Sequence, residues 1–136
     1  MLDQKQINLF KNADISKQNV LIDGKWIPPK SETFANCISP IDGKKITSIS
    51  YGDKTDVDDA VLSARNAFEN GPWPNMSPNE RKKILFKIAE LIEKKSLELA
   101  VLGVKDNGTE INMAIRAEPG SASATFRYYA EALDKV

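Results

Sequence analysis

The pattern of apolar and polar residues changes near Gly52. Between residues 19 and 51, short apolar runs alternate with turn residues, which is typical of β-strands. Beyond Gly52, apolar residues recur about every 3.6 positions, which indicates amphipathic helices. Strands followed by helices predict an α+β chain, or a lobe of something larger.

The strand region is marked by its turns. Asp23-Gly24 separates two apolar runs, and this dipeptide favours a tight hairpin because both central residues need a positive φ. Pro28 and Pro29 end the second run or confine it to an edge. The later runs "TFANCIS" and "KITSISYG" flank the turn "SPIDGK". We therefore predict one small antiparallel sheet of about four strands over residues 19–51.

Capping residues place the first two long helices. Thr55 is predicted to cap a helix, with Asp58 completing a capping box. The next helix is predicted to begin after Ser77, with Pro78 in its first position and Glu80 completing the box. Its apolar stripe should pack on a core.

The remaining helices are marked by Gly and Pro. The segment "SLELAVLGVKDNG" predicts a helix that stops at Asn107-Gly108. The segment "EPGSASATFRYYAEALDKV" predicts another, with Pro119 near its start. Residues 3–13 fit a short helix and a frayed end equally well. The expected chain is a small antiparallel sheet followed by three or four helices.

Composition narrows the class of protein. Nineteen basic and nineteen acidic residues give a net charge of zero, so the positive field of a nucleic-acid-binding protein is lacking. No apolar run reaches the length of a membrane span, and the N-terminus has no signal-peptide core. We expect a soluble, cytoplasmic protein that binds neither nucleic acid nor membrane.

Candidate chemistry is limited because the chain has one cysteine and no histidine. Ser-His and Cys-His nucleophile pairs within the chain are thereby excluded. Cys37 lies in a predicted strand with no histidine or helix N-terminus beside it, so a buried structural role is favoured over a nucleophilic one. Gly103 and Gly108 have P-loop spacing, but Thr109-Glu110 replaces the required Lys-Ser/Thr.

Asp106, in "KDNG", has two interpretations. The simpler one is a polar residue at the end of a helix. The helix dipole mildly disfavours a negative charge there, which leaves a bound cation as the alternative.

Six segments occur in a fixed order along the chain: "LIDGKWI", "ISPIDGKKI", "SYGDKTDVDDAVLSARNAFENGPWP", "MSPNERKKILFKIAELIEKK", "ELAVLGVKDNGTEI" and "FRYYAEALDKV". In this order and spacing they resemble the N-terminal part of NAD(P)-dependent aldehyde dehydrogenases. The nearest type is γ-glutamyl-γ-aminobutyraldehyde dehydrogenase. The resemblance covers residues 19–136 and leaves residues 1–18 as an N-terminal arm or short helix.

This resemblance implies that residues 19–136 are the N-terminal part of an α/β, Rossmann-like coenzyme-binding domain. Family members oxidise an aldehyde to a carboxylic acid with NAD or NADP, through a cysteine thiohemiacetal and a thioester. Their catalytic Cys, general-base Glu and cofactor-binding loops fall beyond the position of Val136. The resemblance therefore implies no catalytic and no cofactor-binding residue here, and a truncated fragment that is inactive alone. The alternative is a stand-alone structural or interaction module.

The resemblance also implies a structural monovalent cation, Na⁺ or K⁺. On this sequence its ligands are the backbone oxygens of Cys37 and Ile38, together with Asp106, and a further ligand would come from the missing part. Oxygen ligands suit such a hard cation. A chain without its packing partners should also expose an apolar helix face, here the one with Phe126 and Leu133. We therefore expect self-association.

Overall fold

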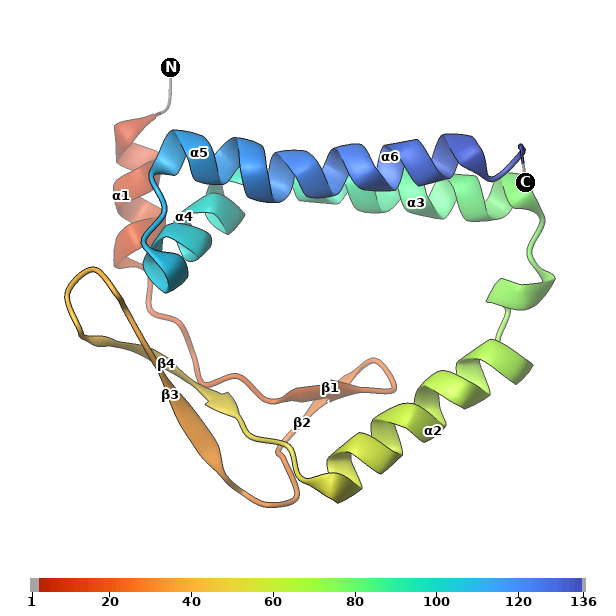
Figure 1. Cartoon of the computed structure of the whole chain (residues 1–136), viewed down its shortest axis with the longest axis horizontal. Helices are drawn as coiled ribbons and strands as arrows, with labels where there is room; N and C mark the ends of the chain where they lie inside the picture. The colour runs from red at the N-terminus through yellow and green to blue at the C-terminus, as the bar shows by residue number, and fades with distance from the viewer. Residues whose placement is uncertain (1–2, 136) are drawn as a thin grey trace. The chain divides into compact units, whose positions relative to one another are not determined.

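The computed structural model describes residues 3–135, which form two compact units. The first unit takes in residues 3–14, 39–42 and 76–135, and the second takes in residues 15–38 and 43–75. Figure 1 labels the elements along the chain.

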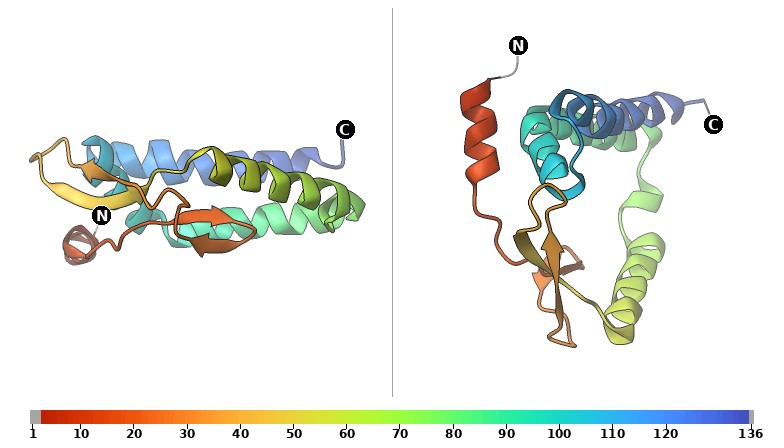
Figure 2. Two further views of the ribbon diagram at one scale, coloured as in Figure 1. Left: turned by 90° about the horizontal axis from the view of Figure 1, so that it is seen from below. Right: turned by 60° about the vertical axis from the view of Figure 1, so that its left-hand side comes forward.

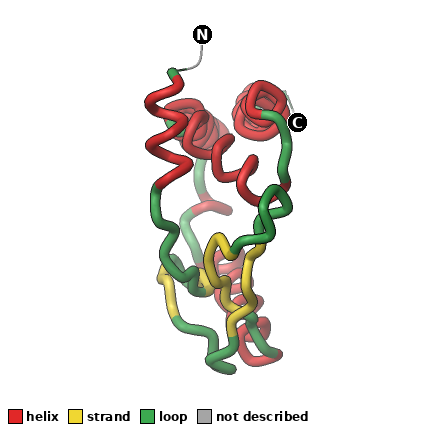
Figure 3. The backbone as a smooth tube through the Cα atoms, turned by 90° about the vertical axis from the view of Figure 1, so that its left-hand side faces the viewer, coloured by secondary structure: helices red, strands yellow, loops and turns green. Residues whose placement is uncertain are grey.

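The second unit contains two separate β-hairpins. Strand β1 (Val20–Ile22) pairs antiparallel with β2 (Lys25–Ile27), and β3 (Phe34–Ile38) pairs antiparallel with β4 (Lys45–Ser50). All of them are drawn in yellow in Figure 3. The strands were predicted correctly, but the prediction that they form a single sheet was wrong.

Two features keep the hairpins apart. Pro28 and Pro29 directly follow β2, and proline cannot donate a ladder hydrogen bond. The chain ahead of β1 pairs with β4 instead: Gln18 N donates to Ser48 O at 2.9 Å, and Ser50 N donates to Gln18 O at 2.9 Å. The edge of β4 is therefore occupied by Gln18.

The turn of the first hairpin forms as predicted. Asp23 and Gly24 both have positive φ, at 53° and 69°. This is the backbone geometry of the tight turns that match the twist of two-residue hairpins.

Helix α2 (Lys54–Asn70) begins two residues earlier than predicted. Its N-cap is Asp53, whose carboxylate accepts from Thr55 N at 2.8 Å and from Asp56 N at 3.0 Å. Asp56 closes the box by accepting from Asp53 N at 3.0 Å. Asp ranks above Thr as an N-cap residue, so the assignment of the cap to Thr55 and of the box to Asp58 was wrong.

The first unit is helical. Its elements are α1 (Gln4–Asn12), α3 (Pro78–Lys94), α4 (Ser96–Asn107), α5 (Ile111–Ile115), η2 (Arg116–Gly120) and α6 (Ser121–Ala132). A short 3₁₀ helix, η1 (Trp73–Asn75), follows α2 and is the last element of the second unit. Of the two alternatives for residues 3–13, the short helix is present as α1, which Asp3 caps by accepting from Lys5 N at 2.9 Å.

Two predicted helix ends are confirmed in this unit. Ser77 caps α3 by accepting from Glu80 N, and Glu80 accepts in return from Ser77 N at 2.8 Å. Helix α4 ends at Asn107, and Gly108 follows with a φ of 77°. Glycine favours this left-handed conformation because it has no Cβ to clash.

The last helix, α6, begins at Ser121, two residues after Pro119, but it continues a helical run that starts earlier, at Ile111. Pro119 is buried inside the helical run, where a wider π-helical turn, η2, accommodates it. Proline has no N–H to donate to the carbonyl of Ile115 four residues earlier. The π-turn continues the helix past this gap, with Ser121 N donating to Arg116 O.

Helices α3 and α6 lie side by side in the first unit (Figures 1 and 2). Ala89 on α3 and Ala130 on α6 are completely buried, and such small side chains let two helices approach closely. At the edge of this contact, Arg127 donates to both carboxylate oxygens of Glu93, at 2.9 and 2.8 Å. Two parallel bonds of this kind fix the geometry of the pair.

The Glu93–Arg127 pair predicts acid sensitivity of the first unit. The hydrogen bond from Arg127 lowers the pKa of Glu93 below its ordinary value of 4.5. A carboxylate whose pKa is lowered in the folded state stabilises the fold at pH values above its ordinary pKa. This stabilisation is lost as the pH falls through the lowered pKa. We therefore expect Glu93→Gln to lower the Tm at pH 7 and to flatten its decline below about pH 5.

Thermal unfolding followed by circular dichroism between pH 3 and pH 7 measures this effect. Glu69→Gln is the control, because Glu69 lies on α2, 3.7 Å from Arg65, outside this pair. The Tm of Glu69→Gln should decline with falling pH as steeply as that of the unsubstituted chain. An equal acid slope in Glu93→Gln and the unsubstituted chain would contradict the assignment.

Candidate functional site

The residues predicted to bind a cation are divided between the two units. Cys37 and Ile38 are neighbours at the end of β3 in the second unit, where the pairing register with β4 shifts between them. Asp106 is exposed near the end of α4 in the first unit. The cation site with these three residues stays a prediction.

Side chains alone do not form a metal centre in the part of the chain that the structure describes. Within residues 3–135, no group of three or more His, Cys, Asp or Glu side chains is arranged to hold a metal ion. The predicted cation ligands include two backbone oxygens, to which this finding does not apply.

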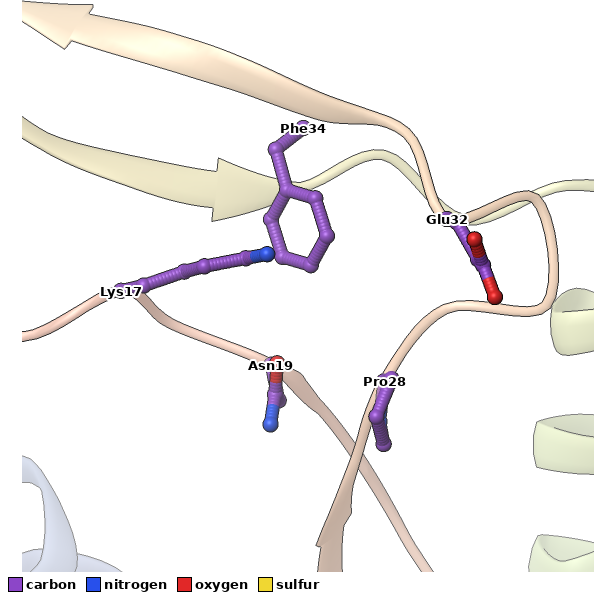
Figure 4. Close-up of a pocket in the computed structure, with 5 residues that line it drawn as sticks. All are labelled: Lys17, Asn19, Pro28, Glu32 and Phe34. Atoms are coloured by element: carbon purple, nitrogen blue, oxygen red, sulfur yellow. The ribbon is translucent and has the colours of Figure 1, made fainter.

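A pocket of about 490 Å³ lies in the second unit, and sequence motifs gave no sign of it. Figure 4 shows the side chains that line it: Lys17, Asn19, Pro28, Glu32 and Phe34. The ammonium of Lys17 lies 3.2 Å from the centre of the Phe34 ring, a cation–π contact. Ligand pockets of this size are common.

The backbone around this pocket is held by hydrogen bonds. Thr47 Oγ1 donates to Ser16 O at 2.9 Å, just ahead of Lys17. Glu32 has a φ of 54°, which few residues other than glycine adopt, and its N–H donates to Pro29 O at 2.9 Å. The lining offers one cation, one carboxylate and one amide but no thiol or hydroxyl nucleophile. It can bind polar groups, but it lacks the nucleophile–base pair of a covalent catalyst.

Asp56 forms the most buried polar cluster of the second unit. Only 3% of the residue is exposed, and its two carboxylate oxygens accept from Lys30 N at 3.1 and 3.2 Å. With the bond from Asp53 N, the carboxylate joins the segment after β2 to the first turn of α2. Lys30 also pairs with Asp59, and the hydrogen bond to Asp59 raises the pKa of Lys30 above its ordinary value. The Asp56 carboxylate and the Lys30 ammonium both form hydrogen bonds that hold the fold, which argues against an acid–base role.

Neither the pocket nor the Asp56 cluster contains the residues of a complete catalytic site. Comparison with known proteins identifies the enzyme class. Residues 26–136 match the family described as "Aldehyde dehydrogenase family", so the chain belongs to that family.

Individual relatives support the same assignment. Aldehyde dehydrogenase 1 of Tanacetum cinerariifolium is 40% identical over 123 residues, which is 90% of this chain and 25% of the relative. The human mitochondrial 10-formyltetrahydrofolate dehydrogenase is 36% identical over 85% of this chain and 12% of its own length. The chain thus spans a quarter or less of these curated relatives.

Solved structures share the fold. The indole-3-acetaldehyde dehydrogenase of P. syringae, in complex with NAD⁺, superposes with a TM-score of 0.92 at 29% identity, over 100% of this chain and 28% of that chain. The aldehyde dehydrogenase KauB from Pseudomonas aeruginosa gives a TM-score of 0.91 at 30% identity, with the same coverage. The prediction of an N-terminal segment of an aldehyde dehydrogenase is confirmed. The assignment to the γ-glutamyl-γ-aminobutyraldehyde type stays a prediction.

The helices also bear on membrane association. Within residues 3–135, none combines the length and apolar character needed to cross a bilayer.

Proposed function

We propose that this chain is the N-terminal portion of an NAD-dependent aldehyde dehydrogenase, which as a whole oxidises an aldehyde to a carboxylic acid. The observation that carries the proposal is the family match over residues 26–136. The P. syringae relative was solved with NAD⁺, which supports NAD over NADP as the cofactor of the whole enzyme. The six segments quoted above support the γ-glutamyl-γ-aminobutyraldehyde dehydrogenase type for the whole enzyme. A cytoplasmic location stays a prediction.

Within such an enzyme, this portion has a structural role. The Asp56 cluster stabilises the second unit, and the α3–α6 contact stabilises the first. Neither positions a catalytic side chain. Cys37 is half-buried in β3, opposite Thr47, and the chain contains no histidine to act as its base. We infer that the 136-residue chain is catalytically inactive by itself.

The test is NADH formation. The purified chain is mixed with NAD and an aliphatic aldehyde, and absorbance at the nicotinamide band is followed beside a full-length relative as positive control. We expect no NADH above the rate without protein. NADH formation that disappears in Cys37→Ala would refute the inference.

A stand-alone, self-associating module is the second candidate function. We expected Phe126 and Leu133 to form its exposed face, but both are half-buried. Large apolar side chains are instead exposed on α2, including Val57, Val61 and Phe68. Exposed apolar surface of this kind supports association. Light scattering over a wide range of protein concentration tests it, and a monomer throughout would count against it.

A further inference from the structure

The pocket shown in Figure 4 carries one positive and one negative charge. The Lys17 ammonium enters it from one side, beside the Phe34 ring, and the Glu32 carboxylate lies on the other side. In the part of the chain that the structure describes, these two groups form no ion pair, so Lys17 Nζ lies more than 4.0 Å from the Glu32 oxygens. The pocket therefore separates two charges of opposite sign.

The polar groups of this pocket do not hold the fold together. The Lys17 ammonium contacts the Phe34 ring. Among residues 3–135, no hydrogen bond is formed by the Asn19 amide or by the Glu32 carboxylate. By contrast, the Asp56 carboxylate of the same unit is used to join two segments of backbone. The pocket groups thus keep their hydrogen-bonding capacity for a ligand.

The wall that carries Lys17 and Asn19 is fixed to β4. Gln18, which lies between them, donates its N–H to Ser48 O and accepts from Ser50 N, both at 2.9 Å. Residues two apart in an extended chain point the same way, and both side chains line the pocket in Figure 4. The backbone that presents the ammonium and the amide is therefore held in place before a ligand binds.

The opposite wall holds Glu32 in an uncommon conformation. Its φ is 54°, a region in which residues with a Cβ are rare and which is maintained only where the surrounding structure fixes it. Here the Glu32 N–H donates to Pro29 O at 2.9 Å. The two flanking residues are both bonded to Tyr51. Ser31 Oγ donates to Tyr51 O, and Tyr51 N donates to Thr33 O, each at 2.9 Å.

We propose that this pocket binds a small zwitterionic amino acid. The carboxylate of the ligand accepts from the Lys17 ammonium, its ammonium donates to the Glu32 carboxylate, and Asn19 offers a further donor and acceptor. Phe34 and Pro28 provide apolar contacts for its carbon chain. A zwitterion matches both charges, whereas a simple anion or cation leaves one of them without a partner. This goes beyond the proposed function, because binding requires no catalytic residue.

Four six-carbon compounds test the charge requirement while the number of carbon atoms stays constant. Leucine and 6-aminohexanoate carry both charges, close together and far apart respectively. Hexanoate carries only the carboxylate, and hexylamine carries only the ammonium. Each is titrated into the purified, isotope-labelled chain, and the backbone amide signals are followed by NMR. We expect at least one zwitterion to bind with a Kd of about 1 mM or lower, and about fivefold more tightly than either single-charge compound.

Two substitutions locate the binding site. Lys17→Gln and Glu32→Gln each remove one charge and preserve most of the side chain, and each should weaken binding of the zwitterion by about threefold to tenfold. Lys25→Gln and Glu69→Gln are the matched controls. They remove the same charges from exposed ion pairs elsewhere in the second unit, and they should bind as the unsubstituted chain does. Amide signals that keep their positions outside residues 15–34 show that a variant has retained its fold.

Three results would overturn the proposal. Neither zwitterion could bind at about 10 mM, a single-charge compound could bind as tightly as the zwitterion, or the control variants could weaken binding as much as the pocket variants. If a pocket variant fails to fold, the four compounds tested on the unsubstituted chain still decide the question. The titrations use neither NAD nor an aldehyde, so their outcome is independent of the proposed function.

Discussion

Asp56→Ala is expected to lower the free energy of unfolding of the second unit by about 3 kcal/mol. The carboxylate is buried and accepts backbone N–H groups from Lys30 and Asp53. Hydrogen bonds to a charged group contribute about 1.5–3 kcal/mol each, and alanine would leave both donors without their acceptor. The substitution should therefore separate the segment after β2 from the start of α2.

Urea unfolding followed by tryptophan fluorescence measures this loss. Both tryptophans, Trp26 and Trp73, belong to the second unit, so the signal reports on that unit. Asp58→Ala is the control, because Asp58 lies on the same helix in an exposed ion pair with Lys54. Its effect should stay within about 0.5 kcal/mol. Equal losses in the two variants would show that Asp56 is not the connecting group.

Ala130→Leu is expected to destabilise the first unit by about 2 kcal/mol, because α3 and α6 leave no space for a larger side chain. Ala130 is completely buried, as is Ala89 on the facing helix. A leucine would force the two helices apart and strain the Glu93–Arg127 pair at their edge.

The matched control is Ala124→Leu, an exposed position on the same helix. It should leave stability nearly unchanged. Thermal unfolding followed by far-UV circular dichroism compares the two variants with the unsubstituted chain. Ala130→Leu should unfold several degrees earlier. If both variants unfold with the unsubstituted chain, α3 and α6 are less closely packed than their buried alanines indicate.

Local signals predicted most element positions, because turns and caps are encoded by neighbouring residues. Asp23-Gly24 and Ser77 with Glu80 have the predicted geometry. The cap of α2 was misplaced because the sequence offers two overlapping boxes, one starting at Asp53 and one at Thr55. The backbone of Lys30, 26 residues before Asp56, adds a donor that only the first box can use.

Features that depend on distant residues were not predictable from patterns. Pro119 was placed near a helix start because proline is common there, and α6 does begin two residues later, but the structure buries Pro119 inside a longer helical run. Glu118, beside it, lies over Gly103 and accepts from Asn107 Nδ2 at 2.9 Å. A side chain at Gly103 would require the carboxylate of Glu118 to move, and Glu118 lies fifteen residues further along the chain.

The pocket lined by Lys17 and Phe34 was also not predictable from sequence patterns, because it joins residues from separate segments. Its residues come from the segment before β1, the segment between β2 and β3, and the start of β3, and no spacing rule joins them. The candidate cation residues were named from a family resemblance, and their assignment rests on it still.

The π-turn at η2 has a consequence for the length of this chain. A π-turn holds one residue more than an α-turn over the same rise. One residue can therefore be lost between Arg116 and Gly120, which would return the turn to α-helical geometry while Ala130 keeps its place against α3. Deletion of a single residue should be tolerated at this point of the helix, where elsewhere it would rotate every later side chain by about 100°.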